Sequence, residues 1–146
     1  MKLPFLIGRA MFGGFFLYNG INHFLQAKQL SNYAGAKDVP MPDVAVRASG
    51  VALLIGGTSI LLGLKPKYGA AAIIAFLAAV SPSIHNFWAD EDEGQRMHDI
   101  VDFSKNLALA GGALALASVE EPWPASVAKG SAAKRAAKTA WRVLAA

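Results

Sequence analysis

Apolar and polar residues occur in long alternating blocks along the chain. Four apolar segments are long enough to cross a bilayer, namely Leu3–Leu25, Val44–Leu64, Tyr68–Trp88 and Ile100–Val119. A helix rises 1.5 Å per residue, so about 20 residues span a hydrocarbon core of roughly 30 Å. The pattern therefore predicts an all-α fold, an antiparallel bundle of four transmembrane helices within residues 1–120.

The remaining residues, 121–146, form a basic tail. On a helical wheel Lys134, Arg135, Lys138 and Arg142 fill one arc, and alanines with Val143 and Leu144 occupy the opposite arc. This spacing predicts an amphipathic helix lying on an anionic membrane surface. A frayed, solvated tail is the alternative.

The composition agrees with a membrane protein and excludes several kinds of chemistry. Hydrophobic residues make up 54% of the 146 residues and charged residues 16%, against about 25% charged in a typical soluble domain. The chain has no cysteine, which excludes disulfides, thiol catalysis and Cys-ligated zinc or iron–sulfur clusters within it. It also lacks a P-loop, G-x-G-x-x-G and H-E-x-x-H. Redox chemistry would require a bound cofactor, a quinone or a partner subunit.

The distribution of Lys and Arg predicts the orientation. With four spans, the side that holds both termini carries eight of these residues, and the other side carries four. The positive-inside rule then places both termini in the cytoplasm. The positive-inside rule already explains the excess of Lys and Arg that gives the chain its net charge of +4. We therefore expect no nucleic-acid partner.

Polar residues interrupt the apolar segments where they reach the external face. The first segment ends with Asn19, Asn22 and His23, the third ends with His85, Asn86 and Trp88, and the fourth begins near His98, Asp102, Lys105 and Asn106. In an antiparallel bundle these ends converge, so we expect a polar pocket, open outward, between the first, third and fourth spans. A charge at bilayer depth costs about 3 kcal/mol unless it is paired or wetted.

Helical spacing suggests a role for several of these residues. Asp102 lies one turn from both His98 and Lys105, so it can orient the imidazole or neutralise the ammonium. His85, His98, Asp102 and Lys105 are the candidate catalytic residues, and His23, His85 and His98 are candidate metal ligands. The candidate ligand-binding set is Arg9, Asn19, Asn22, His23, His85, Asn86, Trp88 and Asn106.

Each of these residues also has a structural interpretation. Histidine, asparagine and tryptophan are common at membrane interfaces, and polar side chains often join helices within a bilayer. Arg9 can extend to the cytoplasmic headgroups.

Several motifs resemble the DoxX family of small bacterial four-helix membrane proteins. They are "GRAMFGGFFLYNGINHF" with Arg9, Gly20 and His23, then "AKDVPMP", "GGTSILLGL", "HNFW" and "KNLALAGGALAL", which together extend from Leu3 to Ser118. The resemblance implies a role in redox metabolism and oxidative-stress tolerance. Some relatives are membrane subunits of thiosulfate:quinone oxidoreductase, and others are thought to assemble with soluble redox enzymes. Many members carry G-x-x-E in the second span, where this chain has Leu53.

Three functions are consistent with these observations. The first is a quinone-associated accessory subunit, which would need a redox protein partner for electron transfer and is not a self-sufficient enzyme. The second is a non-catalytic membrane scaffold, which would recruit partner proteins through its acidic "DEDE" loop or its basic tail. The third is metal or small-solute handling. Lipid is an expected partner in each case, and homo-oligomers are compatible with all three.

Overall fold

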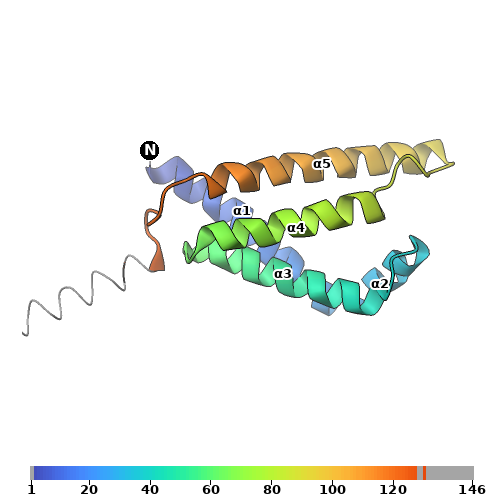
Figure 1. Ribbon diagram of the computed structural model, residues 1–146, viewed down its shortest axis with the longest axis horizontal. Coiled ribbons are helices and arrows are strands. Elements are labelled where there is room, and N and C mark those ends of the chain that lie inside the picture. The colour runs from blue at the N-terminus through green and yellow to red at the C-terminus, as the bar shows by residue number, and fades with distance from the viewer. Residues whose placement is uncertain (1, 128–129, 131–146) are drawn as a thin grey trace, which may run out of the picture.

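The computed structural model describes residues 2–127 and residue 130, and all regular structure in that part of the chain is helical. The long helices are α1 (Lys2–Leu25), α3 (Pro42–Leu62), α4 (Pro66–Ile84) and α5 (Glu93–Ala117), and a short helix α2 (Ala27–Ala36) joins α1 to α3. The long helices alternate in direction (Figure 1). The all-α antiparallel arrangement is therefore confirmed. The tail residues Lys134, Arg135, Lys138 and Arg142 lie outside the described residues.

Three of the helices, α3, α4 and α5, are long and apolar enough to cross a membrane. α1 has 24 residues, which is sufficient length, but it is not among these three. Arg9 and the polar residues of its last two turns, Asn19, Asn22 and His23, lower its mean hydropathy.

Proline and left-handed residues set the helix boundaries near the chain reversals. Pro42 and Pro66 each occupy the first helical turn, where the missing N–H costs nothing. Gly63, with φ of 65°, caps the end of α3, and its N–H donates to the Ile60 carbonyl at 3.2 Å. Asp92 caps the start of α5, where its carboxylate accepts a 2.7 Å hydrogen bond from the Gln95 N–H.

Two helix boundaries differ from the prediction by more than two residues, and one helix was not predicted. The third span was expected to reach Trp88, but α4 ends at Ile84, within one turn of Pro82, which cannot continue the backbone ladder. The fourth was expected to begin at Ile100, but α5 begins at Glu93 because of the Asp92 cap. α2 was not predicted, because its ten residues are too few to register as an apolar span.

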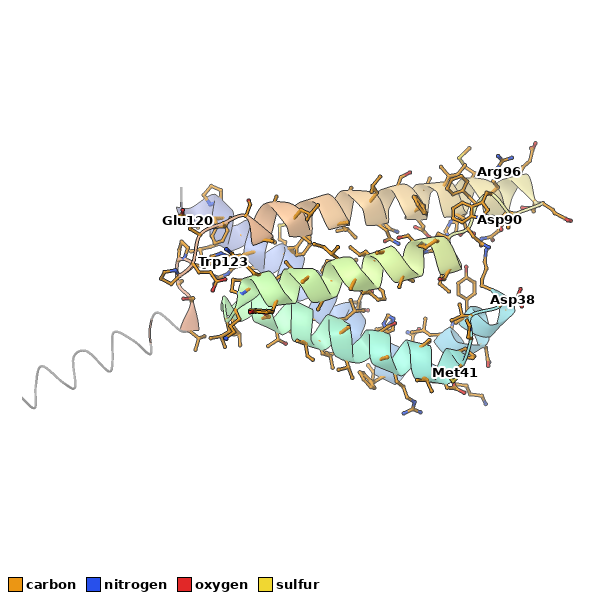
Figure 2. The ribbon with its side chains drawn as sticks, viewed as in Figure 1. Asp38, Met41, Asp90, Arg96, Glu120 and Trp123 are labelled. Carbon is orange, nitrogen blue, oxygen red and sulfur yellow. The ribbon has the colours of Figure 1, made fainter. Side chains whose placement is uncertain are left out.

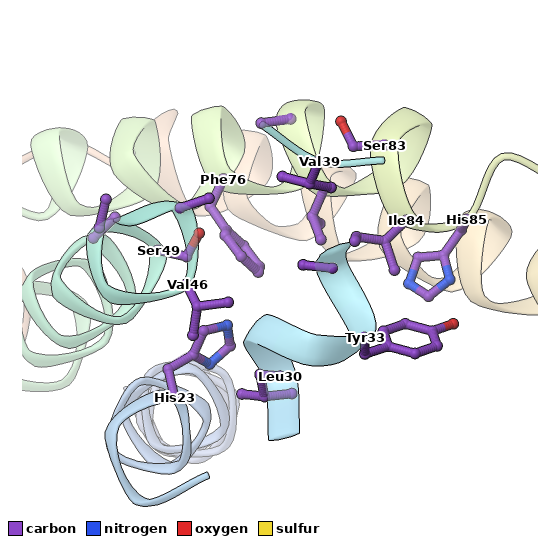
Figure 3. Close-up of a pocket in the computed structure, with 16 residues that line it drawn as sticks. His23, Leu30, Tyr33, Val39, Val46, Ser49, Phe76, Ser83, Ile84 and His85 are labelled. Carbon is purple, nitrogen blue, oxygen red and sulfur yellow. The ribbon is translucent and has the colours of Figure 1, made fainter. Parts of the chain in front are cut away.

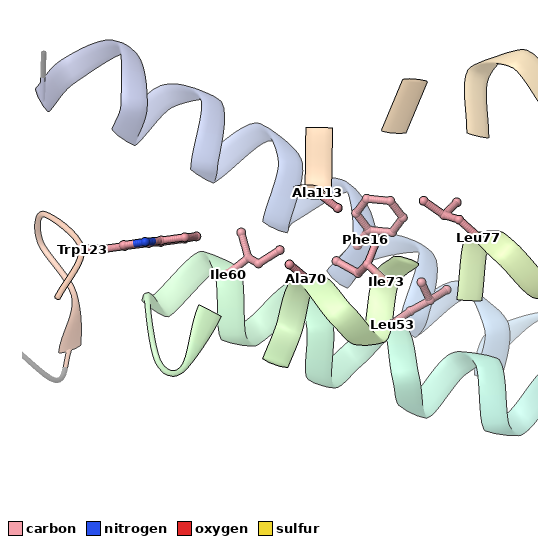
Figure 4. Packing of buried hydrophobic residues seen from close by; sticks show 8 residues of the cluster. All are labelled: Phe16, Leu53, Ile60, Ala70, Ile73, Leu77, Ala113 and Trp123. Carbon is pink, nitrogen blue, oxygen red and sulfur yellow. The ribbon is translucent and has the colours of Figure 1, made fainter. Parts of the chain in front are cut away.

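Small residues bring α1, α3 and α4 into close contact. A methyl group on Gly57 of α3 would lie 2.5 Å from the Leu17 nitrogen of α1, and one on Gly56 would lie 2.7 Å from Ile73 Cγ1 of α4. Gly13, Gly56 and Gly57 therefore lie at helix contacts that a larger side chain would obstruct. The buried core consists of Phe16, Leu53, Ile60, Ala70, Ile73, Leu77, Ala113 and Trp123 (Figure 4).

The segment after α5 packs back onto the bundle at the end that carries the N-terminus. Trp123 is fully buried and contacts Phe5 edge-on, with ring centroids 5.2 Å apart. Arg9 is also buried and donates hydrogen bonds to the carbonyl oxygens of Pro124, at 2.7 Å, and Ala125, at 3.3 Å. Trp123 thus lies at the opposite end of the molecule from Asp38 and Asp90 (Figure 2).

Candidate functional site

A cavity of about 500 Å³ lies between α2, α3 and α4, with the end of α1 forming one edge. We call it the α2 cavity. Its lining consists of His23, Leu30, Tyr33, Ala34, Val39, Ala45, Val46, Ala48, Ser49, Ala52, Phe76, Ala79, Val80, Ser83, Ile84 and His85. Most of this surface is aliphatic, and His23 and His85 stand at separate parts of the wall (Figure 3). The cavity is thus apolar, with two imidazoles and a few hydroxyl groups as its polar features.

A buried carboxylate supports one of these imidazoles from behind. Asp99 of α5 is completely buried, and its Oδ1 lies 3.2 Å from His85 Nδ1. Its other oxygen, Oδ2, accepts a 2.8 Å hydrogen bond from Lys37 Nζ. Asp99 therefore connects His85, on the wall of the α2 cavity, with the residue that follows α2.

Lys37 also binds the loop between α4 and α5. Its ammonium lies 3.3 Å from Asp90 Oδ1 and 3.4 Å from Asn86 Oδ1. We call Lys37, His85, Asn86, Asp90 and Asp99 the Asp99 cluster. Among the described residues, Asp90 Oδ2 is the one buried side-chain oxygen or nitrogen with no hydrogen-bond partner.

The Asp99 cluster raises the pKa values of two side chains, Tyr33 in α2 and Lys37 directly after it. The hydrogen bond to Asp99 raises the pKa of Lys37, and the bond to Asp90 adds to this rise against the effect of burial. Burial raises the pKa of the Tyr33 phenol, and the negative charge of Asp99 raises it further. Lys37 thus remains an ammonium at neutral pH, and Tyr33 keeps its hydroxyl proton.

Three predicted catalytic residues form a second group on the outer face of α5. Asp102 pairs with Lys105 one turn away, and its Oδ2 lies 3.3 Å from His98 Nε2. Both predicted contacts of Asp102 are present. However, the side chains of His98 and Lys105 are 68% and 58% exposed and do not line the α2 cavity. Asp102 also comes within 3.8 Å of His85 Nδ1.

The predicted pocket walls are only partly those of the α2 cavity, which residues of α1 and α4 line. We expected a polar pocket between the first, third and fourth spans, but no residue of α5 lines the α2 cavity. Two walls were missed. They are α2, which carries Leu30, Tyr33 and Ala34 at helical spacing toward the cavity, and α3, which contributes residues such as Val46 and Ser49.

The structure separates the remaining predicted ligand-binding residues. Asn86 belongs to the Asp99 cluster, and His23 lines the cavity, whereas Arg9 binds the Pro124 and Ala125 carbonyls at the opposite end. Asn19 and Asn22 lie beside His23 on α1, Asn106 is buried on α5, and none of the three lines the cavity. Trp88 is 58% exposed and packs edge-on against Phe87.

The three histidines do not form a metal site. Among the described residues, no group of three or more His, Cys, Asp or Glu side chains has the geometry to hold a metal ion. His23 instead bonds within its own helix, with Nδ1 2.8 Å from the Asn19 carbonyl oxygen.

Sequence reasoning missed Lys37, Asp99, Asp90 and Tyr33. Asp99 could have been identified from its spacing, because Asp99, Asn106 and Ala113 recur every seven residues and form the buried stripe of α5. The residues predicted from this helix, His98, Asp102 and Lys105, instead follow the neighbouring face, on which His98 is exposed.

The DoxX family model matches residues 5–86 of the chain. Comparison of the chain with curated proteins and with solved structures found no significant match. The matched region covers α1 to α4, and therefore includes every lining residue of the α2 cavity. Since the match extends over more than half of the sequence and the helices are long and apolar, the chain belongs to the DoxX family and is a small integral membrane protein.

Proposed function

We propose that this protein is a quinone-binding accessory subunit of a membrane redox or oxidative-stress complex. In this proposal all four long helices cross the bacterial inner membrane, with both termini in the cytoplasm and the Asp99 cluster toward the external face. The length of α1 and the alternating helix directions support four crossings, and the Lys and Arg distribution supports the orientation.

The observation that carries the proposal is the α2 cavity with histidines on its wall. A quinone headgroup is a flat, apolar ring with an oxygen at each of two opposite positions. It requires an apolar slot and polar groups at a small number of points. The cavity volume of about 500 Å³ lies within the range of roughly 300–1,000 Å³ that is usual for small-molecule sites.

His85 is the residue best placed to exchange a proton with a bound ring. Its Nδ1 faces Asp99 Oδ1 at 3.2 Å, and its ring forms part of the cavity wall. A buried carboxylate behind an imidazole fixes the ring orientation and stabilises the imidazolium when the ring takes up a proton. Asp99 would play that part here, with Lys37 balancing its charge.

Electrons would be exchanged with a partner, because the chain contains no cysteine to ligate an iron–sulfur cluster. A soluble or membrane redox protein is the partner that this proposal requires. The protein would thus bind the quinone and manage its protons, while the partner carries the electron-transfer centre.

Binding of a short-chain benzoquinone to the purified protein in lipid nanodiscs tests the proposal. Ala79 of α4 lines the cavity, and its neighbour Ala78 is exposed and does not. Ala79→Phe should fill the cavity and weaken binding at least tenfold, whereas Ala78→Phe should leave the affinity unchanged. Equal affinities for both variants would show that the ring binds elsewhere.

A non-catalytic scaffold is the second candidate, favoured by the surface beside the cluster. The exposed Trp88 packs against Phe103 and adjoins the exposed acidic residues Glu91, Asp92 and Glu93. Neutralising these three carboxylates should then abolish co-purification of a partner protein from native membranes, while Ala79→Phe should have no effect on it.

A further inference from the structure

The polar chemistry of the α2 cavity is set by atoms that lie outside it. His23 Nδ1 lies 2.8 Å from the carbonyl oxygen of Asn19. A carbonyl oxygen can only accept a hydrogen bond, so the proton of the neutral His23 ring is on Nδ1. A neutral imidazole carries a single N–H. Its Nε2 is therefore an acceptor.

The same reasoning applies to His85, through a buried ion pair. Asp99 accepts from Lys37 Nζ through Oδ2 and faces His85 Nδ1 with Oδ1. Beside an ammonium at 2.8 Å, Asp99 is a carboxylate and has no proton to donate. The proton of the neutral His85 ring must then lie on Nδ1, which again makes Nε2 an acceptor.

No other charged contact reverses this assignment for His85. From α5, Asp102 Oδ2 lies 3.8 Å from the same Nδ1 atom and is also an acceptor. From α2, the Tyr33 phenol keeps its proton, because its pKa is raised. From the α4–α5 loop, Asp90 and Asn86 bond Lys37 rather than the imidazole.

We infer that the α2 cavity selects a ligand that donates hydrogen bonds, the hydroquinone form rather than the quinone, and that Asp99 and Lys37 are the positioning residues that set this selection. The inference rests on the proposed function for the identity of the ring. A hydroquinone offers an O–H to an Nε2 acceptor. A quinone offers only acceptor oxygens, which gain no hydrogen bond from either Nε2. The Tyr33, Ser49 and Ser83 hydroxyls of the lining can donate or accept and so fit both forms. A site built around one hydrogen-bond pattern discriminates strongly against a ligand that lacks the matching group.

Replacing Asp99 with Asn should exchange the hydrogen-bond donor and acceptor roles of the two ring nitrogens of His85. The Lys37 ammonium can only donate, so it takes the amide oxygen of Asn. The amide NH₂ group then faces His85 Nδ1, which must become an acceptor. The ring proton moves to Nε2, and that atom becomes a donor that suits a quinone oxygen.

Two measurements on the full-length protein in nanodiscs test this inference. The first is ¹⁵N NMR of histidine-labelled protein, assigned by single replacement of the three histidines. The expected wild-type spectrum at neutral pH has His85 protonated on Nδ1 and not on Nε2. Asp99→Asn should reverse this, while Asp38→Asn, at an exposed position with no role in the cluster, should not. A wild-type His85 protonated on Nε2 alone would overturn the inference without any variant.

The second measurement compares the affinities of the reduced and oxidised forms of one short-chain benzoquinone under anaerobic conditions. The wild type should bind the hydroquinone at least tenfold more tightly, and Asp99→Asn should reduce or reverse that preference. Equal affinities of the wild type would overturn the inference and leave quinone binding standing. Binding of neither form would overturn the proposed function itself, and the selectivity with it.

Discussion

Removal of the Lys37 ammonium is the most severe test of the Asp99 cluster. Lys37→Met keeps the length of the apolar stem but leaves the completely buried Asp99 carboxylate without its 2.8 Å partner. Loss of one member of a buried ion pair usually costs about 3–5 kcal/mol. The Lys37 side chain is 16% exposed, so water screens part of the loss. We therefore expect about 3 kcal/mol, roughly a hundredfold change in the unfolding equilibrium.

The assay is reversible unfolding in mixed detergent micelles, combined with hydrogen exchange of the α2 amides. Lys28→Met is a matched control, because Lys28 is an exposed residue at the start of α2. It should change stability by less than about 0.5 kcal/mol. The double variant Lys37→Met/Asp99→Leu should recover most of the loss, since an apolar pair often replaces a buried ion pair at little cost. If Lys37→Met were no more destabilising than Lys28→Met, the cluster would not fasten α2 to the bundle.

Three further predictions concern the packing of α1 on α3, the contacts of Arg9 at the end of the bundle that carries the N-terminus, and the pH dependence of the Lys37 ion pair. Gly57→Ala should destabilise the α1–α3 contact by about 1–3 kcal/mol in the same unfolding assay, whereas Gly14→Ala, with open space around it, should be neutral or slightly stabilising. Arg9→Met should remove two hydrogen bonds to the segment after α5, costing about 1.5–3 kcal/mol, and should shift Trp123 fluorescence to the red. The pKa of Lys37 is raised above 10.5 in the folded protein, so its contribution is fully present at neutral pH and is lost as pH rises through the folded value. Exchange protection of α2 should therefore fall only above pH 10.5, and a loss near neutral pH would contradict this assignment.

The sequence predicted the features of this fold that follow from local periodicity. Each long helix corresponds to an apolar segment of the sequence. The contacts of Asp102 with His98 and Lys105 were also predictable, since they join residues three and four positions apart on one helix.

The site itself depends on contacts between distant parts of the chain. Lys37 and Asp99 are separated by 62 positions and meet only because α2 folds back toward the α4–α5 loop. No periodic pattern marks α2 strongly, because it has ten residues and its apolar positions are interrupted by Lys28, Gln29 and Asn32. The exposed stripe of α5 is rich in charge, with His98, Asp102 and Lys105 at helical spacing, whereas Asp99 shares its buried stripe with Asn106 and Ala113, neither of which is charged.

Photolabelling with an azido-benzoquinone tests the central claim, that the α2 cavity is a quinone site, most directly. The cross-linked peptides would be mapped by mass spectrometry in the wild type and in Ala79→Phe. Quinone binding in the cavity predicts labels on its lining, at or beside Tyr33, Ser83 and His85, and predicts that Ala79→Phe abolishes them. Labels confined to the outer face of α5, or labelling of the cavity that survives Ala79→Phe, would contradict it.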